Sequence, residues 1–207
     1  MKIALCLHGQ LRDYDKSLDS WTAFIKKYKP DLYWHTWDDV PKYGIFQYNL
    51  IKGVTEKSTK YDYSGVTEWA STARNVGPQF ESIHNVLSMI GQSHRGPYDF
   101  IVRARWDLVL HNPTTIDFEL LNPNRYFVAG NHWAGNPDMI DDNIMIGSSP
   151  NIYCHNRIAW WLRSYWLSDR KLIPSGEQLI SSYFKQNDLM KDVVKTEALN
   201  FTLARNL

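Results

Sequence analysis

The sequence predicts an α/β protein built as a single three-layer α/β/α domain with a mostly parallel sheet. Short apolar runs of strand length alternate along its 207 residues with longer segments in which apolar residues recur every three or four positions. The runs at 3–7 and 100–102 are apolar at every position, which is typical of strands buried on both faces of a parallel sheet. A sheet of that kind is covered by helices on both sides.

The elements of the first half follow from apolar spacing and from one proline. Residues 2–7 form a buried strand, and residues 14–28 repeat apolar side chains at helical spacing. Pro30 ends that helix, and residues 31–37 form a second strand. A short strand is expected near residues 45–51, in an otherwise polar, aromatic and glycine-containing region.

The second half continues the alternation of helices and strands and ends in an extended polar tail. Pro78 opens the first of its helices, because proline suits the first turn of a helix. The expected segments are a helix at 79–92, a strand that begins near residue 100, strands at 125–129 and 143–146, helices at 150–167 and 176–185, and the tail at 193–203.

Composition narrows the class of partner. The 23 basic and 22 acidic side chains leave a formal net charge of +1, so no extended charged field favours nucleic acid or a membrane surface. The apolar start has the length of a strand and not of a signal peptide, and no segment approaches the ~18 apolar residues of a membrane span. We therefore expect a soluble cytoplasmic protein with no transmembrane segment and no nucleic-acid partner.

Three charged residues follow the apolar run near residue 100. Arg103, Arg105 and Asp107 lie at i, i+2 and i+4, and in an extended chain such positions point to one side of a sheet. Unpaired charges are costly to bury, so this cluster requires an anionic ligand, a metal ion, or pairing among its own members. A structural ion pair between arginine and aspartate is the plain alternative to a binding site.

Loops that follow parallel strands meet at one edge of the sheet, where open α/β proteins bind their ligands. We therefore expect the loop with Gly9 and Arg12, the acidic strand end at Asp38 and Asp39, and the arginine cluster to share one crevice. Gly9 permits close approach of the backbone, and the planar guanidinium of Arg12 suits phosphate oxygens. Asp38 or Asp39 suits hydrogen bonds to a ribose or a base, or a cap on the next segment. Such a crevice fits a nucleoside diphosphate.

Tryptophans are abundant, with nine in the chain. Trp37, Trp106 and Trp133 lie beside polar residues in expected loops or strand ends, where an aromatic face is suited to stacking on a base or a sugar ring. The tryptophans of the helix expected at 150–167 are assigned to the core or to a partner surface.

Five segments together resemble one family. They are HGQLRDY after the first strand, DLYWHTWDD at the second, YDFIVRARWDLVL in the middle, DDNIMIGSS after it, and IPSGEQLISSYF near the end. In combination they are similar to the small GT-A-type glycosyltransferase-like proteins of bacterial and viral surface-polysaccharide loci. In that family a YDxxIRxRxDL segment stands in place of the metal-binding DxD of nucleotide-sugar transferases.

The resemblance implies a GT-A fold and roles for individual residues. Asp107 matches the last aspartate of DxD, which would hold Mg²⁺ or Mn²⁺, whereas Arg105 stands at the first position and brings a guanidinium in place of a carboxylate. Glu177 matches the acidic residue near the acceptor, although a carboxylate in the first turn of a helix also stabilises the helix dipole. The late histidine of many such metal sites has no counterpart, since the last histidine is His155.

The predicted activity is transfer of a sugar from a nucleotide-diphosphate sugar to a glycan or polysaccharide acceptor. In an inverting reaction a carboxylate deprotonates the acceptor hydroxyl while cationic groups stabilise the leaving diphosphate. Asp142 is the preferred base, with Asp138, Asp141 and Glu177 as alternatives, and a retaining reaction stays open. A different class also stays open, in which a GT-like domain binds a nucleotide or a glycan without turning it over, or serves as an assembly subunit.

Overall fold

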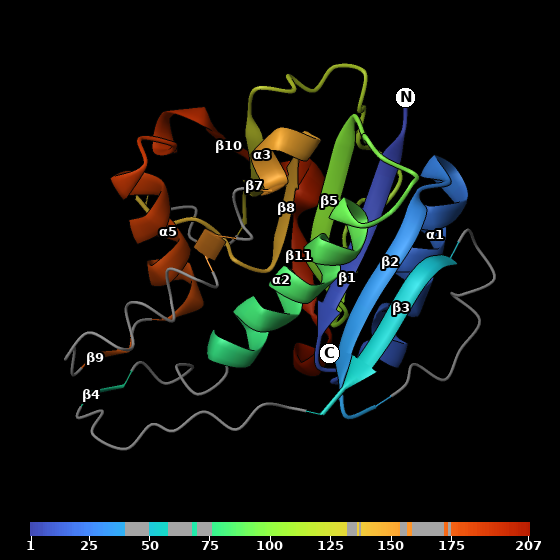
Figure 1. The fold of residues 1–207 in the computed structure, drawn as a ribbon, viewed down its shortest axis with the longest axis horizontal. Helices are drawn as coiled ribbons and strands as arrows, with labels where there is room; N and C mark the ends of the chain where they lie inside the picture. Colours follow the sequence, from blue (N-terminus) through green and yellow to red (C-terminus); the bar gives the residue numbers. More distant parts are fainter. Residues whose placement is uncertain are drawn as a thin grey trace.

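The chain folds around a seven-stranded sheet with helices on both of its faces (Figure 1). The computed structural model describes residues 1–39, 50–57, 68–69, 76–131, 136, 138–153, 157–158, 172–173 and 175–207. Within these ranges, every helix is too short or too polar to span a lipid bilayer.

The order of strands in the main sheet is β10-β7-β8-β5-β1-β2-β3. Strand β8 runs antiparallel to both of its neighbours, and the other six strands share one direction. Their bounds are β1 Ile3–Gly9, β2 Asp31–Trp37, β3 Leu50–Glu56, β5 Phe100–Arg105, β7 Tyr126–Ala129, β8 Ile144–Gly147 and β10 Val193–Thr196. The predicted α/β fold with a mostly parallel sheet is therefore confirmed.

Two small sheets lie outside the main one. Strand β6 (Leu108–Leu110) pairs antiparallel with β11 (Phe201–Leu203), which ties the C-terminal segment to the residues that follow β5. Strand β4 (Glu68–Trp69) pairs parallel with β9 (Leu172–Ile173).

The helices divide between the two faces of the sheet. In Figure 1, α2 lies in front of the strands, α5 lies to their left and α1 lies behind them, and α2 and α5 contribute to the same hydrophobic core. The bounds are α1 Leu18–Tyr28, α2 Val76–Gly91, α3 Ser149–Tyr153 and α5 Gly176–Gln186, with 3₁₀ turns at Tyr14–Ser17, Met190–Asp192, Glu197–Leu199 and Ala204–Asn206.

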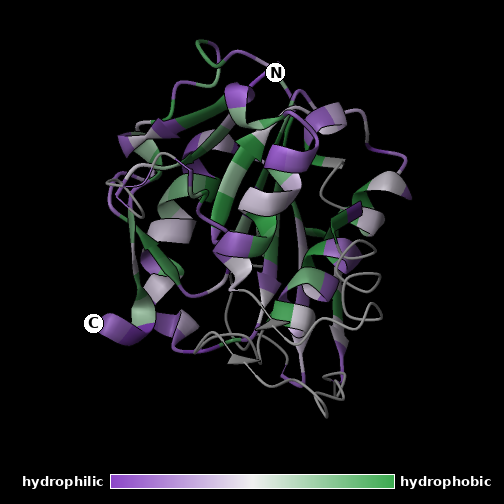
Figure 2. Ribbon diagram, turned by 90° about the vertical axis from the view of Figure 1, so that its left-hand side faces the viewer, coloured by the Kyte–Doolittle hydropathy of each residue, from purple (hydrophilic) through white to green (hydrophobic). Residues whose placement is uncertain are grey.

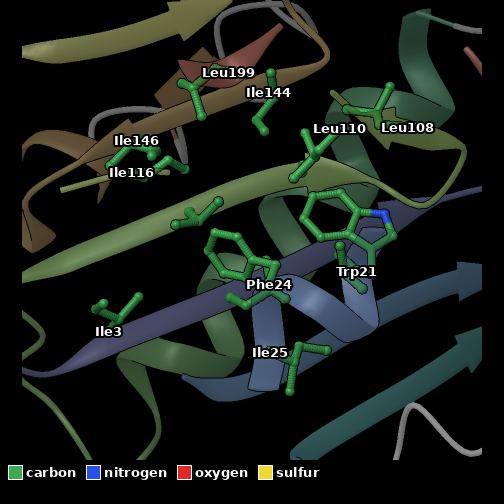
Figure 3. Close-up of a cluster of buried hydrophobic side chains, with 14 of the residues drawn as sticks. Ile3, Trp21, Phe24, Ile25, Leu108, Leu110, Ile116, Ile144, Ile146 and Leu199 are labelled. Atoms are coloured by element: carbon green, nitrogen blue, oxygen red, sulfur yellow. The ribbon is translucent and has the colours of Figure 1, made fainter. Parts of the chain in front are cut away.

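Alternate residues of β1 enter two separate hydrophobic cores. Leu5 and Leu7 join the core beneath α1, where Trp21 and Phe24 are fully buried (Figure 3). Hydrophobic colouring accordingly concentrates in the central strands in Figure 2. Burial on both faces explains why residues 3–7 of the strand are all apolar instead of alternating with polar residues.

The second core lies between the opposite face of the sheet and α2, α3 and α5. Cys6 of β1 contributes to it, with Phe80 and Ile83 from α2 and Phe184 from α5. Each of these side chains is 1% exposed or less, so the helices are fixed against the sheet by burial of apolar surface.

Several element boundaries differ from the expected ones. The helix expected at 79–92 begins at Val76, so Pro78 lies within its first turn. The strand expected near 45–51 is β3, which extends to Glu56, and residues 45–49 lie outside the described part of the chain. The helix expected at 150–167 corresponds to α3 as far as Tyr153, and most of the later residues of that range lie outside the described part of the chain.

The polar cluster after β5 also differs from a continuous strand. Strand β5 ends at Arg105, and the next two residues form a turn that leads into β6. Asp107 therefore does not lie at i+4 on the same strand face as Arg103, contrary to the expectation from spacing.

One glycine in β3 fits beneath a tryptophan of β2. Gly53 is paired directly with Trp34, and a Cβ atom built on Gly53 would lie 1.9 Å from Trp34 Cε2. The indole, which is 8% exposed, therefore occupies the space of the missing side chain.

Gly53→Ala is expected to lower the free energy of unfolding by about 1–3 kcal/mol, because the indole must shift out of its packed position. Urea denaturation of the variant beside Lys52→Ala, a change at an exposed position of the same strand, measures the effect. The control should stay within about 0.5 kcal/mol of the original protein. Equal losses in the two variants would contradict the packing described here.

Candidate functional site

A pocket lies at the carboxyl edge of the main sheet. Strands β1, β2 and β5 end there, and the antiparallel β8 begins there, so four neighbouring strands place residues around it. From these strand ends the pocket is lined by Gly9, Gln10, Arg12, Trp37, Arg105, Asp142 and Asn143.

Two helix starts and the C-terminal segment complete the wall. Helix α2 contributes Gln79, and α5 contributes Gly176 and Glu177. Leu203 of β11 and Arg205 of the last 3₁₀ turn close the remaining side, and Figure 1 places the C-terminus near the end of β1. Residues from both ends of the sequence therefore meet at one site.

Five of the eight predicted site residues line this pocket: Gly9, Arg12, Arg105, Asp142 and Glu177. The other three, Asp38, Arg103 and Asp107, are not among its lining residues. Convergence of strand ends explains the first group, and burial or displacement explains the second, as described below.

Arg105 is held in a fixed orientation by three side-chain contacts. Its Nε donates to Asp107 Oδ1 at 2.8 Å, and its second terminal nitrogen donates to Asp107 Oδ2 at 2.6 Å. The first terminal nitrogen donates to Asn143 Oδ1 at 3.1 Å. Burial acts to lower the pKa of Arg105, but the Asp107 carboxylate outweighs it and raises that pKa. A guanidinium has five N–H groups, so two remain for a ligand.

The turn that contains Asp107 connects distant parts of the fold. The carbonyl oxygen of Trp106 accepts hydrogen bonds from Ser17 Oγ at 2.6 Å and Trp21 Nε1 at 3.3 Å. The carbonyl oxygen of Asp107 accepts from the Ala204 N–H at 2.8 Å. The predicted stacking role of Trp106 is wrong, because its side chain is fully buried in the core beneath α1.

Metal binding at Asp107 has no donor set among the described side chains. Asp107 is 1% exposed, and both of its oxygens accept hydrogen bonds from Arg105. No group of three or more His, Cys, Asp or Glu residues in the described ranges is arranged to hold a metal ion. These residues do not fit Mg²⁺ or Mn²⁺ at this position, and ligation by Asp107 stays a prediction.

Asp38 lies beyond the end of β2 at an exposed position. Its backbone N–H donates to the carbonyl oxygen of Glu56 at 2.8 Å, and its φ of 62° is in the left-handed region. Neither Asp38 nor Asp39 lines the pocket, so their predicted contacts with a ribose or a base stay untested.

Asp142 is a buried carboxylate, 4% exposed, two residues before β8. Gln79 Nε2 donates to its Oδ2 at 2.9 Å. A Cβ atom on Gly176 would lie 1.8 Å from the same oxygen, so only glycine at the first position of α5 leaves room for this carboxylate.

The surroundings of Asp142 raise its pKa. Burial is the main cause, followed by the negative charges of Glu177 and Asp141, and together they raise the pKa from 3.8 to about 7 in spite of Arg105 and Arg103. A carboxylate with such a pKa changes protonation state near neutral pH, as a general base requires.

Asp141 has a structural role that sets it apart from Asp142. Its Oδ1 accepts from the backbone N–H groups of Asn143 at 2.8 Å and Ile144 at 3.2 Å, and its Oδ2 accepts from Asn143 Nδ2 at 3.0 Å. Asp138 is exposed and does not line the pocket. Of the alternative bases, Glu177 alone joins Asp142 in the pocket wall.

Glu177 lies at the start of a well-capped helix. Ser175 accepts from the Gln178 N–H at 3.3 Å, and Gln178 Oε1 accepts from the Ser175 N–H at 3.0 Å, which is a complete capping box. The cap fixes the first turn of α5, so Glu177 is held at the pocket and beside the positive end of the helix dipole.

The loop after β1 is anchored from behind by a chain of polar contacts. Gly9, which has a φ of 98°, donates its N–H to Ser82 Oγ at 2.8 Å, and Ser82 Oγ contacts His35 Nδ1 at 2.7 Å. His35 Nε2 lies 3.4 Å from Glu56 Oε2. Local sequence patterns do not predict this chain of contacts, because its members come from four different elements.

Arg205 is the main pocket residue that sequence reasoning missed. It is exposed and makes no hydrogen bond or ion pair within the described part of the chain. Pairing of β11 with β6 brings Arg205 to the pocket, and nothing local in the tail indicates that pairing.

Trp37 lines the pocket as expected and donates from Nε1 to the carbonyl oxygen of Pro78 at 3.0 Å, whereas Trp133 lies outside the described residues.

Comparison with known proteins finds similarity in fold. No protein-family model and no curated protein matches the sequence. The chain is similar to a glycosyltransferase involved in glycosylation of the major capsid of PBCV-1, with a TM-score of 0.54 and 12% identity over 95% of this chain and 83% of that one. It is also similar to apo GlyE, a glycosyltransferase of Streptococcus pneumoniae TIGR4, with a TM-score of 0.50 and 10% identity over 94% of this chain and 45% of GlyE.

The fold is of the GT-A type. This chain spans less than half the length of GlyE, and at these identities the likeness concerns the fold alone. The predicted fold class is thereby supported from a second direction.

Asp142→Asn is expected to stabilise the protein more at pH 8 than at pH 5. Because the folded-state pKa is raised, the folded chain binds this proton more tightly, and wild-type stability falls as pH rises from about 4 to about 7. The asparagine variant avoids that loss, which amounts to roughly 1.4 kcal/mol for each pKa unit.

Urea denaturation at the two pH values measures this difference. Asp138→Asn, a change at an exposed carboxylate, is the matched control and should give the same difference from wild type at both. A pH-independent effect of Asp142→Asn would show that Asp142 titrates normally.

Proposed function

We propose that the protein is a glycosyltransferase that takes a nucleotide-diphosphate sugar into this pocket and transfers the sugar to a hydroxyl group of a glycan acceptor. One observation carries the proposal: three arginine side chains and a carboxylate whose pKa is about 7 line the same pocket at the carboxyl edge of the sheet. The glycosyltransferase fold adds support, although at 9–12% identity it does not indicate the donor or the acceptor.

The arginines match the charge of a diphosphate. Arg12 and Arg205 are exposed and line the pocket from two segments, one after β1 and one after β11, and Arg105 lines it from the end of β5. Guanidinium groups bind phosphate oxygens through paired N–H donors, and such charge-assisted hydrogen bonds are about twice as strong as neutral ones. Arg105 is oriented by Asp107 and Asn143 before any ligand arrives.

Asp142 is suited to the role of base. In a direct displacement the acceptor oxygen forms a bond to the anomeric carbon, its proton passes to Asp142, and the bond from that carbon to the diphosphate breaks. The electron pair of the broken bond leaves with the diphosphate, whose added negative charge the arginines stabilise. Glu177, in the same wall, is the second carboxylate available to orient the acceptor hydroxyl.

We propose that these arginines neutralise the negative charge of the diphosphate leaving group. In DxD enzymes a divalent cation supplies that charge, and here Arg105 stands at the first position of the motif while Asp107 is bonded to it. The described carboxylates offer no set of oxygen donors for a cation, so no step is assigned to one.

Transfer is tested with a panel of nucleotide-diphosphate sugars and oligosaccharide acceptors, with and without Mn²⁺. Asp142→Asn is expected to lower the rate of transfer by about 100-fold or more, since general bases contribute that much. Asp138→Asn should retain the original rate. Donor binding without turnover in the unmodified protein would support the binding-only alternative, and unchanged transfer in Asp142→Asn would remove the base assignment.

Nucleoside diphosphates are expected to raise the melting temperature more than the matching nucleosides do. A ligand at 100 times its Kd stabilises the folded state by about 2.7 kcal/mol, and the arginines should recognise the diphosphate charge. Arg12→Gln and Arg205→Gln should each reduce the difference between the two ligands.

Arg95→Gln is the control for that measurement, because Arg95 is also exposed and is absent from the wall of this pocket. Differential scanning fluorimetry records the shifts. Equal shifts from nucleoside and nucleoside diphosphate would mean that base and ribose carry recognition, which would contradict the phosphate assignment.

A further inference from the structure

Arg103 is a fully buried arginine behind the pocket. It is 0% exposed and lies on the same face of β5 as Arg105, two residues earlier. Its spacing predicted that it would share the ligand site with Arg105, but Arg103 does not line the pocket.

The guanidinium of Arg103 is oriented toward Asp142. Its first terminal nitrogen donates to the backbone carbonyl oxygen of Asp142 at 2.9 Å and lies 3.3 Å from His8 Nε2. Its Nε and second terminal nitrogen have no hydrogen-bond partner within the described residues. A buried positive charge with no carboxylate bonded to it is costly, so its presence calls for a reason.

His8 does not neutralise that charge. Burial is the main cause that lowers the pKa of His8 well below its usual value, and the charges of Arg103, Arg105 and His35 lower it further. His8 is therefore a neutral acceptor at physiological pH, while Arg103, whose pKa falls to about 10, stays protonated.

We propose that Arg103 is a positioning residue, which fixes the Asp142 turn through its backbone carbonyl and whose unpaired charge favours the ionised form of the Asp142 carboxylate. This rests on the proposed function only where it treats Asp142 as the base. The electrostatic effect itself belongs to the protein without any substrate.

The charged groups around Asp142 determine the balance between its protonated and ionised forms. Glu177 of helix α5 and the adjacent residue Asp141 are both negatively charged, and both favour the protonated form of Asp142. Strand β5 brings Arg103 and Arg105, which favour the carboxylate, whereas Gln79 of α2 is a neutral donor.

Of the two arginines, Arg105 lowers the pKa of Asp142 more, and it is also bonded to Asp107 in a bidentate ion pair. Arg103 has no such partner, and charges interact strongly in a buried environment of low dielectric constant. Without Arg103, burial and the two neighbouring carboxylates would raise the pKa of Asp142 further, and a protonated carboxyl cannot accept a proton from the acceptor.

The test is titration of the Asp142 carboxyl carbon by ¹³C NMR in the ligand-free protein, with Asp142→Asn to assign the signal. Arg103→Met is expected to raise the titration midpoint by about one unit or more, and Arg103→Lys, which keeps a positive charge, by much less. Val102→Ala, a change on the opposite face of the same strand, should leave the midpoint unchanged. An unchanged midpoint in Arg103→Met would overturn the proposal.

Cys6→Asp provides a second variant if Arg103→Met does not fold. Cys6 is paired with Arg103 in the sheet register and is fully buried, so an aspartate there would give the guanidinium a carboxylate partner. Cys6→Asp should raise the Asp142 midpoint and Cys6→Asn, of the same size, should not. Equal midpoints in these two variants would also overturn the proposal.

The pH profile of kcat/KM separates this proposal from the proposed function. If the protein transfers sugar, Arg103→Met should move the acidic limb to higher pH by the shift that NMR records, whereas loss of structure alone would lower the plateau and leave the limb in place. A shifted NMR midpoint in a protein with no transferase activity would support the role of Arg103 and contradict the proposed function. Sugar transfer by Arg103→Met with an unchanged acidic limb and an unchanged NMR midpoint would support the proposed function and contradict the role of Arg103.

Discussion

The bidentate ion pair between Arg105 and Asp107 is the interaction on which the rest of the site depends. It closes the turn that ends β5, so the chain leaves the main sheet and enters β6. The same turn accepts hydrogen bonds from Ser17 and Trp21 on the α1 side and from Ala204 in the C-terminal segment. One short turn therefore fixes a pocket arginine, the packing of α1 and the path of the tail that carries Arg205. Arg105, which stands where the resemblance to DxD would place an aspartate, forms this structural connection with Asp107.

Burial acts in opposite ways on the charges of Asp142 and Arg103. Asp142 is desolvated beside Glu177 and Asp141, so its proton is held more tightly than in water. Arg103 is desolvated without a bonded carboxylate, so its charge acts on whatever acid lies nearest. Each group is unfavourable alone, and each reduces the cost of the other.

Local patterns were sufficient to predict the long buried strands but not to predict which charged side chains are buried. Apolar runs predicted β1, β2 and β5 because burial on both faces leaves a direct mark on the sequence, and the parallel topology then predicted that Gly9, Arg12 and Arg105 would meet. Spacing could not distinguish Arg103 from Arg105, since which one is covered depends on the Asp142 turn, about 40 residues away. Arg205 was not predicted because its position depends on the pairing of β11 with β6, and a three-residue strand gives no local signal.

The contact between Gly9 and Ser82 bears on how tightly the pocket can bind. Its amide is turned toward α2 and is held there by Ser82, His35 and Glu56, so the loop after β1 is joined to the helix behind it and not only to its own neighbours. A loop that is ordered on folding does not have to be ordered on binding, and the conformational entropy lost on ligand association is correspondingly smaller. Affinity at this wall would then respond to changes at Ser82, a buried residue that does not line the pocket.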